Sequence, residues 1–421
     1  MRLIMRQKTS MNHQVIQPII RQHAANAAFY WLQKEESRFS PLVKSADLRQ
    51  FNQYIDANLE GLHVAGDDGW AESYAALRRW HSQGEAFVCG FLANQCQNPA
   101  WMKATWSYVS KYADTTLNGY VSALSHSAKE HVYDTVNEFL LSSIPSEVQI
   151  ALNICSQSKL HLSEDFLIKK LDTGNIQEKV AVLDYIRKLG LQSYLPALTV
   201  YFGSNELSVR FSAVSAACWL SSDKSMMINP LCLLIDDYLT LPPLRGIEGI
   251  RKNQQTEMLV RLLGQCCSEL TYPFAFISGL PEYLQIIFYA HYANTKTLPL
   301  LLSLMEKEEL SRIAFVAVSL ITGIDIDDKE YLLPAKDEKL PEITSRLNMF
   351  GTGIGMPDIH KITSVCQQYR NEERLFLGKL VTTSWCNTNF SDGSQLVRWI
   401  ASWHLFHLDK NTLPKDNLLN Y

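Results

Sequence analysis

Apolar residues recur at helical spacing through two segments that lie about a hundred residues apart and share one pattern. The first segment begins Leu-Pro-Ala-Leu at Leu195 and continues as Val-Arg-x-x-Ala from Val209. The second begins Leu-Pro-Leu-Leu at Leu298 and continues as Arg-Ile-Ala from Arg312. The proline precedes the arginine by 14 residues in the first segment and by 13 in the second. A helix pair that recurs in this way predicts an all-α chain built as an α-solenoid.

The predicted repeat region runs from residue 146 to 334, and its second helices align on three basic residues, Lys179, Arg210 and Arg312. Eleven residues after each of these comes a small residue suited to ending a helix, namely Gly190, Ser221 and Gly323. Residues 241–253 hold two prolines and two glycines, which predicts the longest loop inside the repeats. The expected helices are 164–171 with 177–189, 194–202 with 208–220, the less regular 226–239, 254–267 and 281–292, and 297–306 with 310–321.

The regions on either side of the repeats follow a different pattern. Residues 1–15 are polar and predicted to be disordered, whereas residues 16–145 have helical but non-repetitive spacing. Residues 335–421 are predicted to be mostly helical, with the clearest helices at 357–369 and 394–407. Five of the nine tryptophans precede residue 107 and three follow residue 384. This distribution favours specialised ends that cap a repeat array, because terminal repeats must cover an otherwise exposed core.

Composition narrows the class of partner and the compartment. Net charge is −4 and no polybasic run is present, which argues against nucleic acid and acidic lipid as partners. Nine cysteines without a Cys-x-x-Cys spacing suit a reducing compartment. The N-terminus lacks the apolar run of a signal peptide. The apolar stretch 274–293 contains Pro281 and Glu282, so we expect a buried helix pair there, no membrane span, and a cytoplasmic protein.

Three patterns that could carry chemistry are incomplete. The glycines at 351, 353 and 355 lack the Gly-x-Gly-x-x-Gly spacing and the preceding strand of a nucleotide loop. Residues 323–328 are acidic but do not continue with the ligands of a calcium loop. His404 and His407 are spaced as two metal ligands would be, yet no third ligand is evident, and a helix packing by aromatic contacts is favoured. The sequence therefore predicts no metal, no cofactor and no enzymatic activity.

The three aligned basic residues have two interpretations. Lys179, Arg210 and Arg312 could each pair with an acidic residue of the preceding turn and so stack successive repeats. They could instead contribute to a groove that binds another protein along the second helices. Structural stacking is the favoured interpretation, and protein binding through these residues and their neighbourhoods is retained as the functional hypothesis.

The repeats resemble HEAT repeats, and the whole chain resembles a family of bacterial HEAT-repeat proteins often encoded beside type VI secretion genes. The most specific match lies in the N-terminal region, and further matches lie near the end of the repeats and beyond it. The matching segments are Gln22–Leu32, Asp56–Trp70, Gly84–Phe87, Ala314–Phe315, Ile321–Asp325 and Arg374–Gly378.

This resemblance implies a cytoplasmic accessory to secretion, such as an adaptor or chaperone whose partner is a secretion effector or spike component. It supplies no catalytic residue. Two alternatives stay open, an immunity protein that sequesters one toxin and, with less support, a helical-repeat enzyme. The sequence leaves the oligomeric state open.

Overall fold

A computed structural model describes residues 16–127, 129–334, 353–369, 373–409 and 412 of the 421-residue chain. The described part is helical apart from one hairpin of two short strands, which confirms the predicted all-α class. The chain forms two compact units. The first comprises residues 1–36 and 48–154, and the second comprises residues 37–47 and 155–421. No helix within the described ranges is long and apolar enough to span a membrane.

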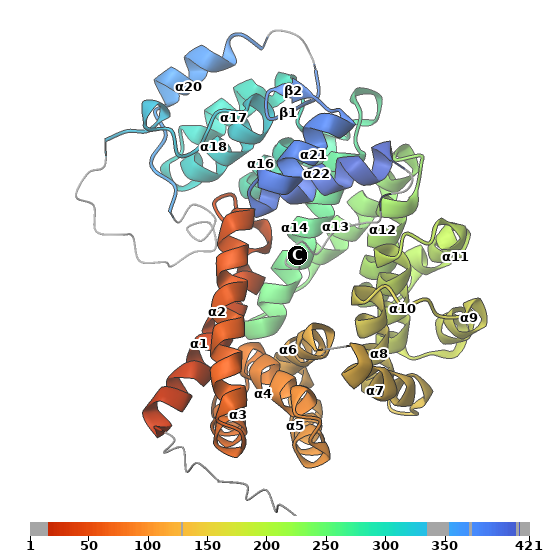
Figure 1. Ribbon diagram of the computed structural model, residues 1–421. Helices are drawn as coiled ribbons and strands as arrows, with labels where there is room; N and C mark the ends of the chain where they lie inside the picture. Colours follow the sequence, from red (N-terminus) through yellow and green to blue (C-terminus); the bar gives the residue numbers. More distant parts are fainter. Residues whose placement is uncertain (1–15, 128, 335–352, 370–372, 410–411, 413–421) are drawn as a thin grey trace, which may run out of the picture. The chain divides into compact units, whose positions relative to one another are not determined.

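The first unit is a set of packed helices without the repeat pattern (Figure 1). Its centre is Trp31, which is 1% exposed, stacks on Phe87 at a centroid distance of 5.4 Å and donates from Nε1 to the hydroxyl of Ser122. Close helix approach requires Gly119, since a Cβ there would lie 1.8 Å from the carbonyl oxygen of Gln83. The helices are α1 (Gln17–Glu36), α2 (Ser45–Val64), α3 (Asp67–Trp80), α4 (Gln83–Gln95), α5 (Pro99–Lys111), α6 (Ala113–His126), α7 (Lys129–Leu141) and α8 (Pro145–Gln157).

The second unit contains five successive helix pairs, which we call the helix array (Glu164–Thr322). Each second helix contacts the second helix of the next pair, so that α10, α12, α14, α16 and α18 form a continuous inner row. The pairs are α9 (Glu164–Thr173) with α10 (Ile176–Lys188), α11 (Leu195–Thr199) with α12 (Leu207–Leu220), α13 (Ile228–Thr240) with α14 (Gly246–Cys266), α15 (Phe274–Ser278) with α16 (Glu282–Tyr292), and α17 (Leu298–Met305) with α18 (Glu308–Thr322).

Short 3₁₀ segments stand beside these helices. They are η1 (Ser37–Phe39), η2 (Gln192–Tyr194), η3 (Val200–Gly203), η4 (Ser225–Met227), η5 (Glu269–Thr271), η6 (Thr295–Thr297) and η7 (Lys329–Tyr331). The predicted loop 241–253 is wrong in its second half, because α14 begins at Gly246 and runs through it. Gly246 adopts a φ of 60°, which permits the sharp turn into the helix.

Among the C-terminal elements, α22 packs on the inner row (Figure 1). Trp219 of α12 contacts Trp399 and Trp403, and Leu396 lies against side chains of α16 and α18 around a cavity of about 40 Å³. Residues 212–220 of α12 are consequently all buried. The C-terminal elements are α20 (Ile359–Cys366), β1 (Leu375–Phe376), its antiparallel partner β2 (Lys379–Leu380), α21 (Thr383–Asp392) and α22 (Gln395–Leu408).

The segment Ser37–Asp47 belongs to the same unit because it pairs with the start of α22. The amide of Gln395 donates to the carbonyl of Val43, and the amide of Leu396 donates to the carbonyl of Ser40. These backbone bonds complement the packing of Phe39 against Trp399. The segment thus joins α22 in covering the inner row.

A second connection crosses the carboxyl ends of the inner helices. Arg374 donates from Nη2 to the carbonyl of His291 (3.0 Å) near the end of α16, and from Nη1 to the carbonyl of Cys267 (3.4 Å) at the end of α14. The amide of Gly378 donates to the carbonyl of Ile321 in α18. Helix ends leave carbonyls without intrahelical partners, and a buried guanidinium complements their partial negative charge. Residues 373–378 therefore tie three inner helices together.

The described helices follow the predictions closely at 177–189, 208–220, 310–321 and 394–407, while the helix expected at 357–369 is shorter, at Ile359–Cys366. The compact units differ from the expected division at residue 145 in two ways. Residues 146–154 group with the first unit, and residues 37–47 group with the second. The predicted disorder of residues 1–15 and the linker at 336–339 lie outside the described residues.

Candidate functional site

The three aligned basic residues do not meet in one site. Arg210 forms an ion pair with Asp237 of α13, which belongs to the following helix pair rather than to the preceding turn. Arg312 donates from Nε to the carbonyl of Ile354 at 3.0 Å. Lys179 lies with its Nζ 5.9 Å from the centroid of the Tyr201 ring. Two of the three are therefore used inside the fold, and the third lies at a groove.

The corner between α9 and α10 holds Lys179 in a fixed frame. Asn175 caps α10 by accepting from the amide of Glu178 at 3.0 Å, and Glu178 accepts in return from the amide of Asn175. Lys170 of α9 forms an ion pair with the same Glu178 carboxylate. Gly174 completes the turn, because a Cβ there would lie 2.2 Å from the carbonyl oxygen of Lys170. These contacts fix where the first turns of α10 project.

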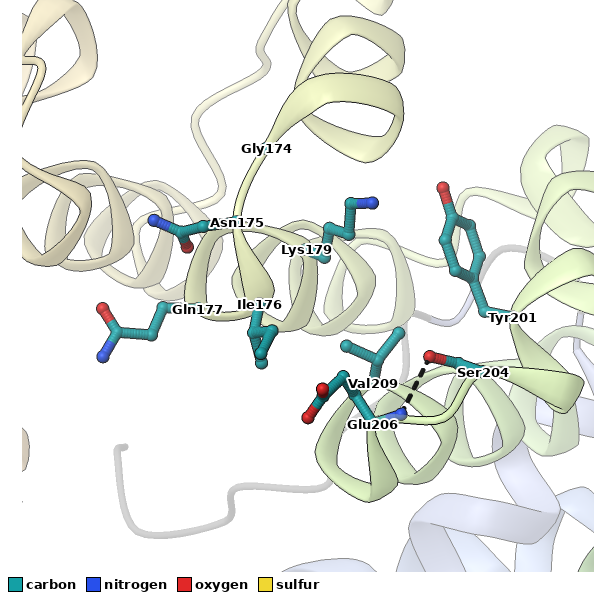
Figure 2. Close-up of a pocket in the computed structure, with 9 residues that line it drawn as sticks. All are labelled: Gly174, Asn175, Ile176, Gln177, Lys179, Tyr201, Ser204, Glu206 and Val209. Atoms are coloured by element: carbon teal, nitrogen blue, oxygen red, sulfur yellow. Dashed lines mark hydrogen bonds between the residues drawn. The ribbon is translucent and has the colours of Figure 1, made fainter.

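The groove lies between this corner and the next one, where η3 leads into α12 (Figure 2). It is open on one side and has a volume of about 500 Å³. Tyr201 forms one wall and is held by a hydrogen bond from its hydroxyl to the carbonyl of Leu171 at 2.8 Å. Its lining residues are Gly174, Asn175, Ile176, Gln177, Lys179, Tyr201, Ser204, Glu206 and Val209.

The groove combines an apolar surface with separated charges. Ile176 is 44% exposed and adjoins the buried Val209, which gives the groove apolar contact area. Lys179 extends toward Tyr201, while Glu206 lies at the start of α12 (Figure 2). Neither charge takes part in an ion pair within the described part of the chain. A ligand entering the groove would therefore meet one available cation and one available anion.

The two histidines considered as metal ligands belong to the aromatic contact between α22 and the helix array. His407 packs on Trp403 with a centroid distance of 4.6 Å, and His404 packs on Phe376 at 5.8 Å. Across the described ranges, no three His, Cys, Asp or Glu side chains are arranged to hold a metal ion. Of the glycine-rich segment, Gly351 lies outside the described residues, and Gly355 packs on the side chain of Leu332.

Sequence reasoning located Lys179 but not the groove around it. A capping-box signal, Asn175 followed three residues later by Glu178, could have located the rigid corner. Tyr201 and Glu206 carry no comparable signal, because they become neighbours of Lys179 only when the second pair packs on the first.

No family model, no curated protein and no solved structure matches this chain.

Proposed function

We propose that this protein is a non-catalytic adaptor or chaperone that binds another protein through the groove at Lys179. The observation that carries this proposal is an open groove of about 500 Å³ between two corners whose side chains are held in place. We further propose that the five helix pairs form a HEAT-like α-solenoid, a proposal supported by the continuous contacts of the inner helices.

A protein segment fits the groove better than nucleic acid does. Lys179 is balanced by Glu206, and nucleic acid binding relies on several basic groups that neutralise phosphates. The exposed amides of Asn175 and Gln177 can donate to and accept from a peptide backbone. Apolar area from Ile176 adds contact that does not depend on charge.

The groove is also favoured over the inner helices, which the sequence indicated as the binding face. From α12 to α18 that face is packed against α22 and the segment Ser37–Asp47. A partner could reach it only by displacing these elements. The groove, in contrast, lies at the corners that precede α10 and α12 and is open to solvent.

The resemblance to proteins encoded beside type VI secretion genes supplies the biological setting of the proposal. A cytoplasmic adaptor of that kind would hold a secretion effector or spike component before export. Deleting the gene should then reduce effector secretion. Loss of toxin protection alone would replace this proposal with an immunity function, and no effect on either would contradict both.

A charge-reversal pair tests the groove. The protein and its Lys179→Glu variant are used to capture partners from the native host, and the identified partner is then titrated in purified form. We expect Lys179→Glu to weaken binding at least about 10-fold, because it replaces the groove's available cation with an anion. Lys169→Glu, on the exposed surface of α9, is the matched control and should bind as the unaltered protein does. Equal binding by both variants would contradict the groove as the docking site.

A further inference from the structure

Three histidines lie together beneath α22, far from the groove. His291 of α16 contacts Trp399 of α22 with a centroid distance of 5.3 Å, and His404 and His407 are one turn apart on α22 itself. His291 is fully buried, and the other two are half-buried. Together they contribute to the seat of α22, by which we mean its contact surface with α12, α14, α16 and β1.

His291 is held in its neutral form by the hydrogen bond that it accepts from Arg261. Its Nε2 lies 3.0 Å from Nη1 of Arg261, and because a guanidinium only donates, Nε2 must accept. Its Nδ1 lies 3.3 Å from the side-chain nitrogen of Gln265, whose oxygen accepts from Arg374 at 2.8 Å. Protonation of Nε2 would break the bond to Arg261 and place two cations in contact.

The surroundings of His407 also disfavour its protonated, positively charged form. Its Nε2 is inaccessible to solvent and has no hydrogen-bond partner among the described residues. The imidazole packs on Trp403, and the Lys224 ammonium also lies against Trp403, 4.9 Å from the ring centroid. Lys224 is fixed there because it donates to the carbonyls of Cys218 and Ser221.

The groups that face the three histidines are cations and thiols. Arg261 and Arg374 face His291, Arg374 also faces His404, and Lys224 faces His407. Burial, and then these cations, lower the pKa of all three imidazoles, that of His407 to about 3. The surrounding titratable groups are the thiols Cys218, Cys266 and Cys267, the phenol of Tyr292, and the carboxylates Asp223, Glu257 and Asp409.

The three carboxylates come from different places in the second unit. Asp223 is exposed and binds the amide and hydroxyl of Ser225. Glu257 lies one turn before Arg261 on α14, and Asp409 follows α22. A proton arriving at the cluster therefore meets the cations Arg261, Arg374 and Lys224.

We propose that this histidine cluster makes the seat of α22 an acid-sensitive switch, in which protonation releases α22 and uncovers the inner helices while the rest of the fold persists. The direction of the pH effect on α22 release follows from the linkage between proton binding and release. A histidine that stays neutral when seated but titrates normally when released takes up a proton on release, so acid favours release below about pH 6.5. The proposal does not depend on the function assigned to the groove.

Thiol accessibility in the full chain provides the test. Cys218 is fully buried in the helix next to α22, whereas Cys89 is fully buried in the first unit. The chain is exposed to 4,4′-dithiodipyridine between pH 7.5 and 4.5, and the labelled cysteines are located by mass spectrometry. We expect Cys218 labelling to rise steeply below pH 6 while Cys89 stays protected and far-UV circular dichroism changes little.

Histidine variants make the test specific. His407→Gln and, independently, His404→Gln should lower Cys218 labelling at pH 5 by more than about 10-fold, because each removes one proton taken up on release. His161→Gln, at an exposed position of the same unit, should change nothing. Simultaneous labelling of Cys218 and Cys89 would show global unfolding and overturn the proposal. So would labelling that is independent of pH, or equal labelling in all three variants.

Discussion

Gly323 and Gly378 each lie against the backbone next to the other. A Cβ at Gly323 would stand 2.8 Å from the carbonyl oxygen of Leu377, and a Cβ at Gly378 would stand 2.5 Å from the carbonyl oxygen of Thr322. Both glycines have positive φ, 80° and 76°. The end of α18 and the hairpin β1–β2 can therefore approach only because neither position carries a side chain.

Gly378→Ala should destabilise the protein by about 2 kcal/mol or more, since it adds a left-handed alanine and a backbone clash. Urea unfolding monitored by circular dichroism would measure the change in unfolding free energy. Gly203→Ala is the control, because a Cβ there meets nothing within 4 Å. A Gly378→Ala variant as stable as this control would show that the two backbones separate easily.

Arg374→Met should cost about 3 kcal/mol or more. The substitution leaves buried carbonyls at the ends of α14 and α16 without their charged donor, and unsatisfied buried groups are expensive. Thermal unfolding of the purified variant gives the comparison, with Arg245→Met at an exposed position as control. Matching melting temperatures would mean that water replaces the guanidinium.

Trp70→Ala should cost about 3 kcal/mol. Trp70 is half-buried and stacks on Trp101 and on Tyr74, with centroid distances of 5.0 and 4.9 Å, so the substitution removes ring contacts and leaves a cavity. The nearby Trp80 is 62% exposed, and Trp80→Ala should change the unfolding free energy by less than about 0.5 kcal/mol. Unfolding of the two variants at the same urea concentration would show that the ring contacts of Trp70 do not stabilise the protein.

Alkaline pH should weaken the first unit through Cys89. Burial raises the pKa of this thiol to about 12, so the folded state keeps it protonated while the unfolded state ionises near pH 9. The contribution of this thiol to the stability is therefore fully present below pH 9 and is lost as the pH rises toward 12. By pH 10 the loss amounts to about 1.4 kcal/mol for one thiol. Cys89→Ala should flatten the decline in stability between pH 8 and 10, and an unchanged slope would refute the assignment.

The helix pairs were predictable because the residues that start and end each helix lie next to it in the sequence. The Leu-Pro start at Leu195 and Leu298 and the spacing to Arg210 and Arg312 mark helix ends directly. The partners of those arginines were not predictable, since Asp237 and Ile354 come from separate segments. The same limit applies to the groove, whose walls meet only through packing.

The coverage of the inner helices did leave a signal in the sequence. Residues 213–220 of α12 are apolar on every side apart from one serine, and a helix without a polar face is buried all round. This pattern indicates a covering element but does not identify it. Nothing local to Val43 reveals that its carbonyl will bind the amide of Gln395.

The bond from Gln395 to Val43 also has a consequence for biosynthesis. The ribosome makes the segment Ser37–Asp47 early but adds its backbone partners in α22 about 350 residues later. At elongation rates of about 5–20 residues per second, roughly 20–70 s pass between the two events. During that interval the segment lacks its partners in α22, and the second unit cannot close until α22 has been synthesised. Each inner helix would therefore remain without this cover from its own synthesis until that of α22, at the stage when chaperones meet newly made chains.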